Sequence, residues 1–428
     1  MSTALETITQ KARQHPDMRF IALAHRLTPA FLQETWLQMN RRGAPGVDGE
    51  TMRAFEADLS ARCAQLVERL KAKQYVAPPV RRVEIPKGEG KTRPLGIPTV
   101  EDRLLQRAVA RLVEAVFEAD FLDVSYGFRP NRNAHGALRR LRQHIVLDKT
   151  RWVFEADIRG YFNHIQHDGV RKMVAHRIGD GTLLQLIGKW LQAGVMDHGV
   201  LVRTDEGSPQ GGPISPVLAN IYLHYVLDLW FERRFRPGCQ GEAHLVRFAD
   251  DFVVTFQDSR DAQRFAQELR ERMAQFGLEL AADKTRLLPF GRFAREWSPA
   301  GGRLPTFDFL GFTHVSGRTW EGKFTLVRIP RRKSLRQFLD RVHTWLVAHR
   351  HWRRRDQQAH LAAMLQGFYQ YFGLHHCRRK LWGIYYEVQR QWAMQLRRRS
   401  QRHRMFWSYL RTREWFILPQ PRLTHPAV

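Results

Sequence analysis

The sequence predicts an α+β fold followed by a helical C-terminal region, and three observations support this. Up to about residue 328, helical patterns of apolar residues alternate with short apolar runs joined by tight turns, as is typical of α+β domains. Beyond residue 328 the patterning becomes helical and the composition strongly basic. The chain has 428 residues, 43% hydrophobic and 26% charged, which is enough for two or more domains around sizeable cores.

The first elements are helices and one hairpin. Residues 1 to about 75 are expected to be helical with polar interruptions, including a loop at NRRGAPGVDG before a helix. From Val80, the run VRRVEIPKGEGKTRPLGIP alternates apolar and basic residues around a GEGK turn and predicts a hairpin. A long helix is expected from about Val100 to Ala119, because apolar residues recur there every three or four positions.

The elements that follow carry three aspartates. RWVFEADIRGYF predicts a strand that contains Asp157, residues 168–192 are expected to be helical, and EGSPQGGPISP is a loop running into a helix. LVRFADDFVVTF predicts two short strands with Asp250 and Asp251 at the tip of a tight hairpin. DAQRFAQELRERMAQFGLEL then predicts an amphipathic helix, and FDFLGFTHV and KFTLVRIP are each expected to be a short strand.

The C-terminal region combines basic and aromatic residues. From Arg328 to Val428 there are 22 lysines and arginines against four acidic residues, together with six of the twelve tryptophans. This composition is typical of a surface that follows a phosphate backbone and packs against bases or sugars. Alternatively, the tryptophans form a core and the arginines a solvated face, and both interpretations can hold at once.

The net charge points to a polyanionic partner. Lysine and arginine number 69 against 42 acidic residues, a formal charge of +27 that favours nucleic acid. An anionic membrane surface is the competing partner, but no apolar span of 18 residues is present, and the N-terminus has no apolar core of signal-peptide type. The three cysteines are far apart and form no CxxC pair, so no disulfide framework or zinc module is expected, and a reducing, cytoplasmic setting fits.

Asp250 and Asp251 need an explanation, because adjacent like charges repel in any partly buried position. Binding of a divalent cation would offset that repulsion, whereas the plainer alternative is a solvated turn. Asp157 ends an apolar strand, and strand ends of one sheet can bring carboxylates together from distant sequence. The three aspartates therefore suggest a two-metal site for phosphoryl transfer.

The order of the motifs resembles that of reverse transcriptases of the group II intron type, over roughly residues 40 to 315. The blocks are GAPGVDG, IPKGEGKTRPLGIPTVEDRLLQ, SYGFRPNRNAHGAL, FEADIRGYFNHI, EGSPQGGPISPVLANIYLHYVLD, RFADDFVV, GLELAADKTRLL and FDFLGF. The resemblance implies a right-hand polymerase, in which fingers and a palm with an antiparallel sheet are followed by an α-helical thumb and maturase bundle. The implied divisions are 1–155 for an N-terminal extension and the fingers with part of the palm, 156–328 for the palm with the catalytic aspartates, and 329–428 for the basic thumb and maturase domain.

The resemblance also assigns a metal site. Asp157, Asp250 and Asp251 match the family's catalytic, metal-binding aspartates, with backbone of Ala156 and Ile158 nearby. The implied cofactor is a pair of Mg²⁺ ions, for which Mn²⁺ can substitute.

Further positions match residues that contact the nucleotide or the nucleic acid. Phe162 matches the aromatic residue under the sugar of the incoming nucleotide, where a bulky ring leaves no room for a 2′-hydroxyl; core packing is the alternative. Lys87 and Arg93 match finger residues that contact the triphosphate, and Gln210 matches the residue that orients the nucleotide near its sugar. Four other positions have two open interpretations each, contact with substrate or nucleic acid against a surface or structural role: Lys284, Arg129, Lys91 and Arg81.

The implied function is an RNA-directed DNA polymerase that also binds its intron RNA as a maturase, assists splicing and copies the RNA at a target site. Its partners would be intron RNA, a DNA primer or target and dNTPs, with no membrane, and the protein would act in the bacterial cytoplasm, at the nucleoid when on DNA, as a monomer or homodimer. Phe248 stands where tyrosine is commonest in the family, and the absence of an HNH or zinc-bearing endonuclease suggests the endonuclease-lacking class. Two alternatives are a domesticated reverse transcriptase in phage defence, DNA repair or spacer acquisition, and a splicing cofactor that does not polymerise.

Overall fold

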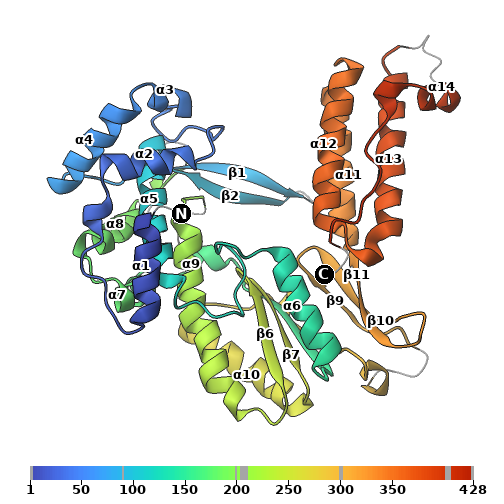
Figure 1. The fold of residues 1–428 in the computed structure, drawn as a ribbon, viewed down its shortest axis with the longest axis horizontal. Helices are drawn as coiled ribbons and strands as arrows, with labels where there is room; N and C mark the ends of the chain where they lie inside the picture. Colours follow the sequence, from blue (N-terminus) through green and yellow to red (C-terminus); the bar gives the residue numbers. More distant parts are fainter. Residues whose placement is uncertain are drawn as a thin grey trace. The chain divides into compact units, whose positions relative to one another are not determined.

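The computed structural model describes residues 3–88, 91–197, 200–202, 211–297, 302–400 and 406–425. The chain forms two compact units, and each is made of several separate segments. The first unit comprises Met1–Asn133, Ala156–Val254 and Arg260–Arg286, and the second comprises Ala134–Glu155, Thr255–Ser259 and Leu287–Val428. Helices and sheets are mixed along the chain and the C-terminal region is helical, so the α+β prediction is confirmed at this level (Figure 1).

The N-terminal helices of the first unit pack around one long central helix, α5. Their bounds are α1 Thr3–Gln14, α2 Pro29–Leu37, α3 Met52–Ala57, α4 Leu59–Lys71 and α5 Val100–Phe117. Helix α5 confirms the predicted helix, and its N-cap is Thr99, whose hydroxyl accepts a hydrogen bond from the backbone N–H of Asp102. Most of its side chains are buried, and α1, α2 and α3 all contact it, so α5 is the core of this helical layer.

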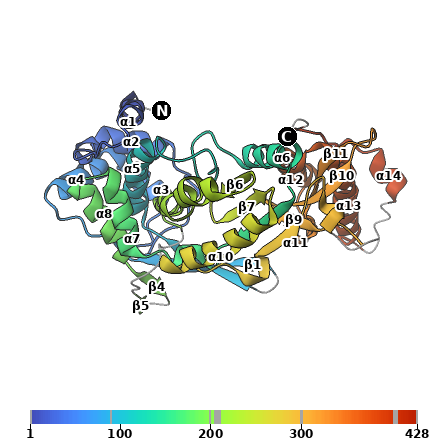
Figure 2. The same ribbon diagram turned by 90° about the horizontal axis from the view of Figure 1, so that it is seen from below.

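Four further helices of this region follow in the sequence: α7 His167–Arg177, α8 Gly181–Gln192, α9 Ser215–Leu223 and α10 Ser259–Gln275. The single helical stretch expected over 168–192 is therefore two helices, α7 and α8, which lie beside each other (Figure 2). The break falls at Asp180, whose carboxylate accepts hydrogen bonds from the backbone N–H groups of Thr182 and Leu183. The other carboxylate oxygen accepts from Leu23 and Ala24, so a local cap and a distant loop together fix Asp180 at the start of α8.

One sheet lies wholly within the first unit, with strand order β2-β1-β4-β5. Its strands are β1 Val80–Gly88, β2 Lys91–Ile97, β4 Val195–Asp197 and β5 Val200–Val202. Strands β1 and β2 form the predicted antiparallel hairpin, with an irregular register between Pro86 and Gly88. The β1–β4 pair is parallel, so this sheet combines antiparallel and parallel pairs.

A second sheet contains the strands that carry the three aspartates, in the order β6-β7-β3-β8. Its strands are β3 Trp152–Asp157, β6 Ala243–Phe248, β7 Asp251–Phe256 and β8 Arg286–Pro289. The division between the two units falls within β3 and β7. The backbone N–H of Arg151 donates to the carbonyl of Phe256 at 2.9 Å, joining the start of β3 to the end of β7, so the two strands run in opposite directions.

The third sheet belongs to the second unit and has the order β11-β10-β9. Its strands are β9 Thr306–Phe309, β10 Phe312–Arg318 and β11 Phe324–Pro330. The segment FDFLGFTHV, expected as one strand, is two antiparallel strands, and that prediction was wrong. The reason is a tight turn at Leu310 and Gly311, whose φ angles are 49° and 77°.

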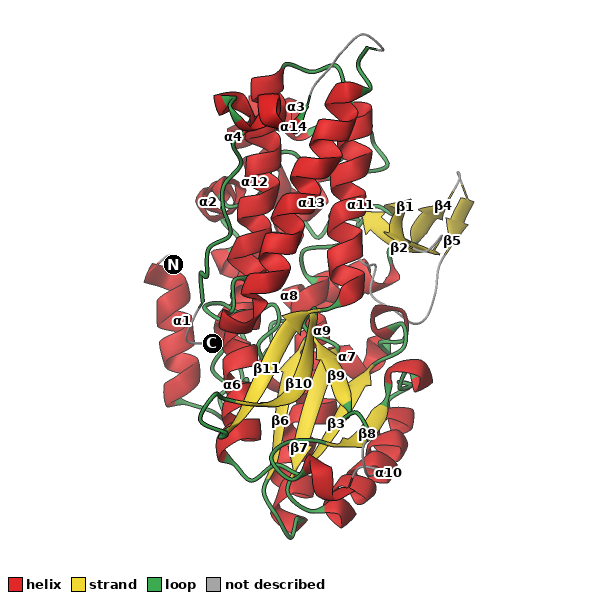
Figure 3. Cartoon of the chain, turned by 90° about the vertical axis from the view of Figure 1, so that its right-hand side faces the viewer, coloured by secondary structure: helices red, strands yellow, loops and turns green. Residues whose placement is uncertain are grey.

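The helices of the second unit are α6 Ala134–Leu147, α11 Arg332–Ala348, α12 Arg354–Phe372, α13 Arg378–Arg397 and α14 Trp407–Arg411. Helix α13 packs against α11 and α12, and the three lie side by side in Figures 1 and 3. Trp392 is fully buried and donates its indole N–H to Gln357, whereas Trp352 is 50% exposed. The tryptophans of this region thus serve both as core and as surface. Within the described ranges, no helix has the length and apolar character needed to cross a membrane.

Candidate active site

The three aspartates lie where the strands of one sheet begin and end. Asp157 is the last residue of β3, Asp250 lies in the turn after β6, and Asp251 is the first residue of β7. Because β3 and β7 are antiparallel neighbours, the end of β3 that carries Asp157 and the start of β7 that carries Asp251 lie at the same end of the sheet. All three carboxylates belong to the first unit and are partly exposed, so the fold gathers them at one accessible sheet edge.

Lys284 brings a positive charge to this edge. It ends a short 3₁₀ turn, Ala282–Lys284, and its ammonium forms an ion pair with Asp157. Burial would lower the pKa of Lys284, but the hydrogen bond and charge of Asp157, followed by the charges of Asp283 and Asp251, outweigh this and raise it. The lysine side chain is still 52% exposed. Lys284 therefore lies in the field of carboxylates from two different strands.

The backbone at Ile158 is oriented by the segment beside it. The carbonyl of Asp157 accepts from the N–H of Ala281 at 2.8 Å, and the N–H of Arg159 donates to the carbonyl of Glu279 at 2.8 Å. Ile158 forms the isolated antiparallel bridge with Leu280 between these two bonds. Because successive carbonyls alternate in direction, that of Ile158 turns away from this segment and toward the side of β3 on which β7 lies.

Phe162 follows closely after Asp157. It lies in the 3₁₀ turn Tyr161–Asn163, which begins after Gly160 with φ 54°, and it is only 9% exposed. Its ring lies 5.5 Å from that of Tyr161, whose hydroxyl donates to the carbonyl of Ala219. Burial raises the pKa of Tyr161, and the charge of Asp250 adds to this, so Asp250 lies near this turn.

The expected nucleotide-binding residues are located only in part. Lys87 lies in β1 at the register irregularity, Arg93 lies in β2 opposite Ile85, and Lys91 begins β2. Gln210 lies outside the described residues. The adjoining Gly211 has φ 123°, and a Cβ there would overlap the carbonyl oxygen of Gly96, so Gly211 packs directly on the backbone of β2.

Arg81, the other basic candidate on this hairpin, makes contacts within the fold. Its Nε and Nη2 donate to the carbonyl of Pro45 at 3.1 and 2.8 Å. The guanidinium therefore ties the hairpin to the GAPGVDG loop.

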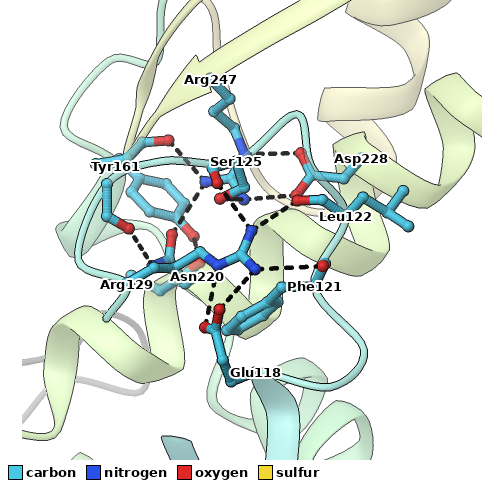
Figure 4. Close-up of polar contacts among 12 residues, drawn as sticks. Glu118, Phe121, Leu122, Ser125, Arg129, Tyr161, Asn220, Asp228 and Arg247 are labelled. Atoms are coloured by element: carbon cyan, nitrogen blue, oxygen red, sulfur yellow. Dashed lines mark hydrogen bonds and ion pairs between the residues drawn. The ribbon is translucent and has the colours of Figure 1, made fainter. Parts of the chain in front are cut away.

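Arg129 is engaged by protein atoms and only 7% exposed. Its Nε and Nη2 bind the two carboxylate oxygens of Glu118 at 3.1 and 2.8 Å. The remaining donors reach the carbonyls of Phe121, Leu122 and Ser125 (Figure 4). Of the two interpretations, contact with template and a structural role, these hydrogen bonds favour the structural one.

The sequence analysis did not predict one buried ion pair of this region. It joins Arg247, three residues before Asp250, to Asp228 at 2.6 Å. Both side chains are 0% exposed. The available signal was a lone basic residue inside the apolar strand LVRF, together with an aspartate in the apolar helical segment LHYVLDLW. Such residues are seldom fully buried unless paired.

A carboxylate cluster at a sheet edge, in a strongly basic α+β chain, is the arrangement expected of an enzyme that transfers nucleotidyl groups on nucleic acid. Residues 85–314 match the family described as reverse transcriptase (RNA-dependent DNA polymerase), and the chain belongs to this family.

The curated relatives extend the similarity over most of the chain. Protein YkfC of Escherichia coli K12 is 33% identical over 311 residues, which cover 64% of this chain and 81% of that protein. The group II intron-encoded protein LtrA of Lactococcus lactis subsp. cremoris is 28% identical over 449 residues, covering 86% of this chain and 73% of LtrA. The nuclear intron maturase 1 of Arabidopsis thaliana is 30% identical over 143 residues, or 32% of this chain and 20% of that protein. The expected similarity to reverse transcriptases of group II introns is confirmed.

Proposed function

We propose that this chain synthesises DNA on an RNA template at the site formed by Asp157, Asp250 and Asp251, and that it serves a group II intron as a maturase. The observation that carries the polymerase proposal is the placement of these carboxylates at one sheet edge, in a chain of the reverse transcriptase family. The ion pair of Asp157 with Lys284 supports it, because a cation already stands at this edge.

The groups at this edge fit magnesium. Carboxylate and backbone carbonyl oxygens are the hard ligands that Mg²⁺ prefers, and Asp157, Asp250, Asp251 and the carbonyl of Ile158 would hold the ions. Two Mg²⁺ ions, or Mn²⁺ in their place, would supply activation of the primer 3′-hydroxyl and stabilisation of the leaving pyrophosphate.

Other residues of the chain would bind and orient the substrates. On the hairpin, Lys87 would offer a point charge and Arg93 a planar fork to the triphosphate oxygens. Phe162 and Gln210 would define the space around the sugar of the incoming dNTP, and Lys284 would act close to Asp157. Fingers up to residue 155, a palm over 156–328 and a thumb with maturase function over 329–428 form part of this proposal, as do work in the bacterial cytoplasm and action as monomer or homodimer.

The maturase proposal rests on the basic C-terminal helices and on the similarity to LtrA, which is encoded by a group II intron. The similarity to YkfC, whose name mentions no intron, keeps a domesticated role in defence or repair as a second candidate. An intron RNA fold flanking the gene would favour the first role and its absence the second. A splicing cofactor without polymerase activity is the third candidate.

The test is primer extension on an RNA template with dNTPs and Mg²⁺, comparing the unaltered chain with Asp250→Asn plus Asp251→Asn. DNA product is expected from the first and not from the second, because the variant removes two carboxylate ligands while RNA binding, measured by fluorescence anisotropy, persists. The matched control removes two exposed carboxylates elsewhere, Asp17→Asn plus Asp340→Asn, and should copy RNA normally. DNA synthesis by the Asp250 and Asp251 variant, or none by the unaltered chain, would contradict the proposal and in the second case favour the splicing cofactor.

A further inference from the structure

The turn that carries Asp250 and Asp251 has an unusual backbone. Ala249, between β6 and the two aspartates, has φ 57°, in the left-handed region that residues with a side chain seldom occupy. Such a conformation costs about 1 kcal/mol or more and persists where the surroundings hold it. The contacts around Ala249 are therefore the place to look for what orients the carboxylates.

Arg247 contacts this turn through its side chain. Its Nη1 donates to the carbonyl of Ala249 at 3.0 Å and to Oδ1 of Asn220 at 3.1 Å. Its Nη2 donates to Oγ of Ser125 at 2.8 Å and to Oδ2 of Asp228 at 2.6 Å, while Nε donates to Oδ1 of Asp228 at 2.7 Å. Figure 4 shows Arg247 beside Ser125, Asn220 and Asp228. The planar fork is thus fixed by four partners, one of which is the turn itself.

The backbone of Arg247 is held as well. Its N–H donates to the carbonyl of Val124 at 2.8 Å, and its carbonyl accepts from the N–H of Tyr126 at 2.9 Å. Residues 124–126 therefore pair with the last part of β6, and the parallel bridge between Ser125 and Arg247 belongs to the same contact. Residues 124–126 thus hold the main chain of Arg247, and Ser125 of the same segment also accepts from its side chain.

That segment also touches the turn directly. A Cβ at Gly127 would overlap the backbone nitrogen of Ala249, so only glycine fits there without a shift of the backbone. The amide of Asn220 donates to the carbonyl of Gly127 at 2.6 Å and accepts from Arg247, which closes the contact from helix α9. On this side, the turn at Ala249 is therefore enclosed by the backbone of Gly127 and by the guanidinium of Arg247.

We propose that the buried Arg247–Asp228 pair is a positioning device for the catalytic turn: it fixes the carbonyl of Ala249 and thereby the direction of Asp250 and Asp251. This rests on the proposed function, in which those two carboxylates hold the metal. A purely structural need would not require a charged pair, since well-packed apolar residues often replace a buried ion pair at no loss of stability. A fork that binds Asp228 on one side and the turn on the other requires arginine.

The test compares Arg247→Lys with a control of the same chemistry, Arg177→Lys. Arg177 is also a buried arginine of the first unit, paired with Asp120 at 3.0 Å, and its other partners are the carbonyls of His15 and Ala12. Melting temperature, Mn²⁺ binding followed by electron paramagnetic resonance without nucleotides, and kcat and KM for dNTP would be measured on the full chain. Both variants should melt lower, because each replaces a fork with a point charge.

Only Arg247→Lys should also bind Mn²⁺ about tenfold more weakly and lose roughly ten- to a hundredfold in kcat, with little change in KM. A variant that melts lower but keeps the Mn²⁺ affinity and kcat of the unaltered chain would overturn the proposal. If Arg247→Lys does not fold, Ser125→Ala removes a single partner of the fork and should shift Mn²⁺ binding in the same direction, by less; no shift would again overturn it.

The two proposals fail in different ways. If the unaltered chain binds Mn²⁺ at the aspartates and copies no RNA, yet Arg247→Lys weakens that binding, the polymerase proposal fails and the positioning stands. If the unaltered chain copies RNA and Arg247→Lys equals it in every readout except melting temperature, the positioning fails alone.

Discussion

Asp102 shows how a single buried carboxylate can support the fold near the candidate site. It is almost fully buried on α5 and accepts hydrogen bonds from the hydroxyl of Tyr75, the indole N–H of Trp190 and the amide of Gln106. The Oε1 atom of Gln106 in turn lies against Gly212, close to the loop that contains Gln210. Burial raises the pKa of Asp102 to about 6, with a further contribution from the charge of Glu101, although the three hydrogen bonds oppose it.

The raised pKa predicts how stability changes with pH. A carboxyl whose pKa is higher in the folded than in the unfolded state contributes stability that is complete below about pH 4 and is lost as the pH rises through about 6. Relative to Asp102→Asn, the unaltered chain should therefore lose up to about 3 kcal/mol of unfolding free energy between these two pH values. Urea titrations at several pH values measure this difference. A difference that stays constant from pH 4 to 7 would contradict the prediction.

The individual site residues were predictable from the sequence to different degrees. Asp250 and Asp251 could be placed on a hairpin because their flanking runs are apolar and rich in β-branched residues, and the structure has that hairpin. The Arg247–Asp228 pair could not be predicted, because nothing in the sequence says which helix packs behind which strand. Nor could the structural role of Arg129, which depends on three carbonyls of a folded loop.

At the scale of elements, periodicity predicted types well and boundaries less well. The hairpin of β1 and β2 and the helix α5 follow directly from their patterns. FDFLGFTHV was misjudged because its apolar run continues through the turn, and Leu310 gives no sign of a left-handed conformation. The break at Asp180 depends on a loop far away in the sequence, which periodicity does not report.

The turn between β9 and β10 gives a test with a matched pair of glycines. Gly311 has φ 77°, and a Cβ there meets no atom closer than 3.6 Å, so Gly311→Ala should cost roughly 1 kcal/mol through backbone conformation alone. Gly367 lies in α12 with open space around its Cβ position, so Gly367→Ala should stabilise by roughly 0.5 to 1 kcal/mol. Thermal melting of both variants checks the signs, and equal shifts would contradict this account of the turn.

At the scale of the whole molecule, the charge of +27 sets how the chain meets nucleic acid. Arg378, Arg379 and Lys380 are three consecutive exposed cations at the start of α13. The affinity for RNA falls as salt rises, so a plot of log affinity against log salt has a negative slope. If the three cations contact phosphates, changing all three to Gln should make this slope shallower by about 2 for single-stranded RNA. A control with the same loss of charge uses residues already paired with glutamates: Arg41, Lys71 and Arg236. Equal slopes for the two triple variants would show that this stretch makes no specific phosphate contacts.

The interleaving of the two units has a consequence for how the protein is made. The chain leaves the first unit after residue 133, returns at 156, and completes that unit only at residue 286. On the ribosome, helix α6 therefore emerges long before α11 to α14, the other α-helices of its unit in the described part of the chain, which begin at Arg332. The nascent chain must keep this amphipathic segment from aggregating while most of the polypeptide is synthesised. Translation rate and chaperone supply, more than the finished fold, should decide how much of this protein a cell can accumulate.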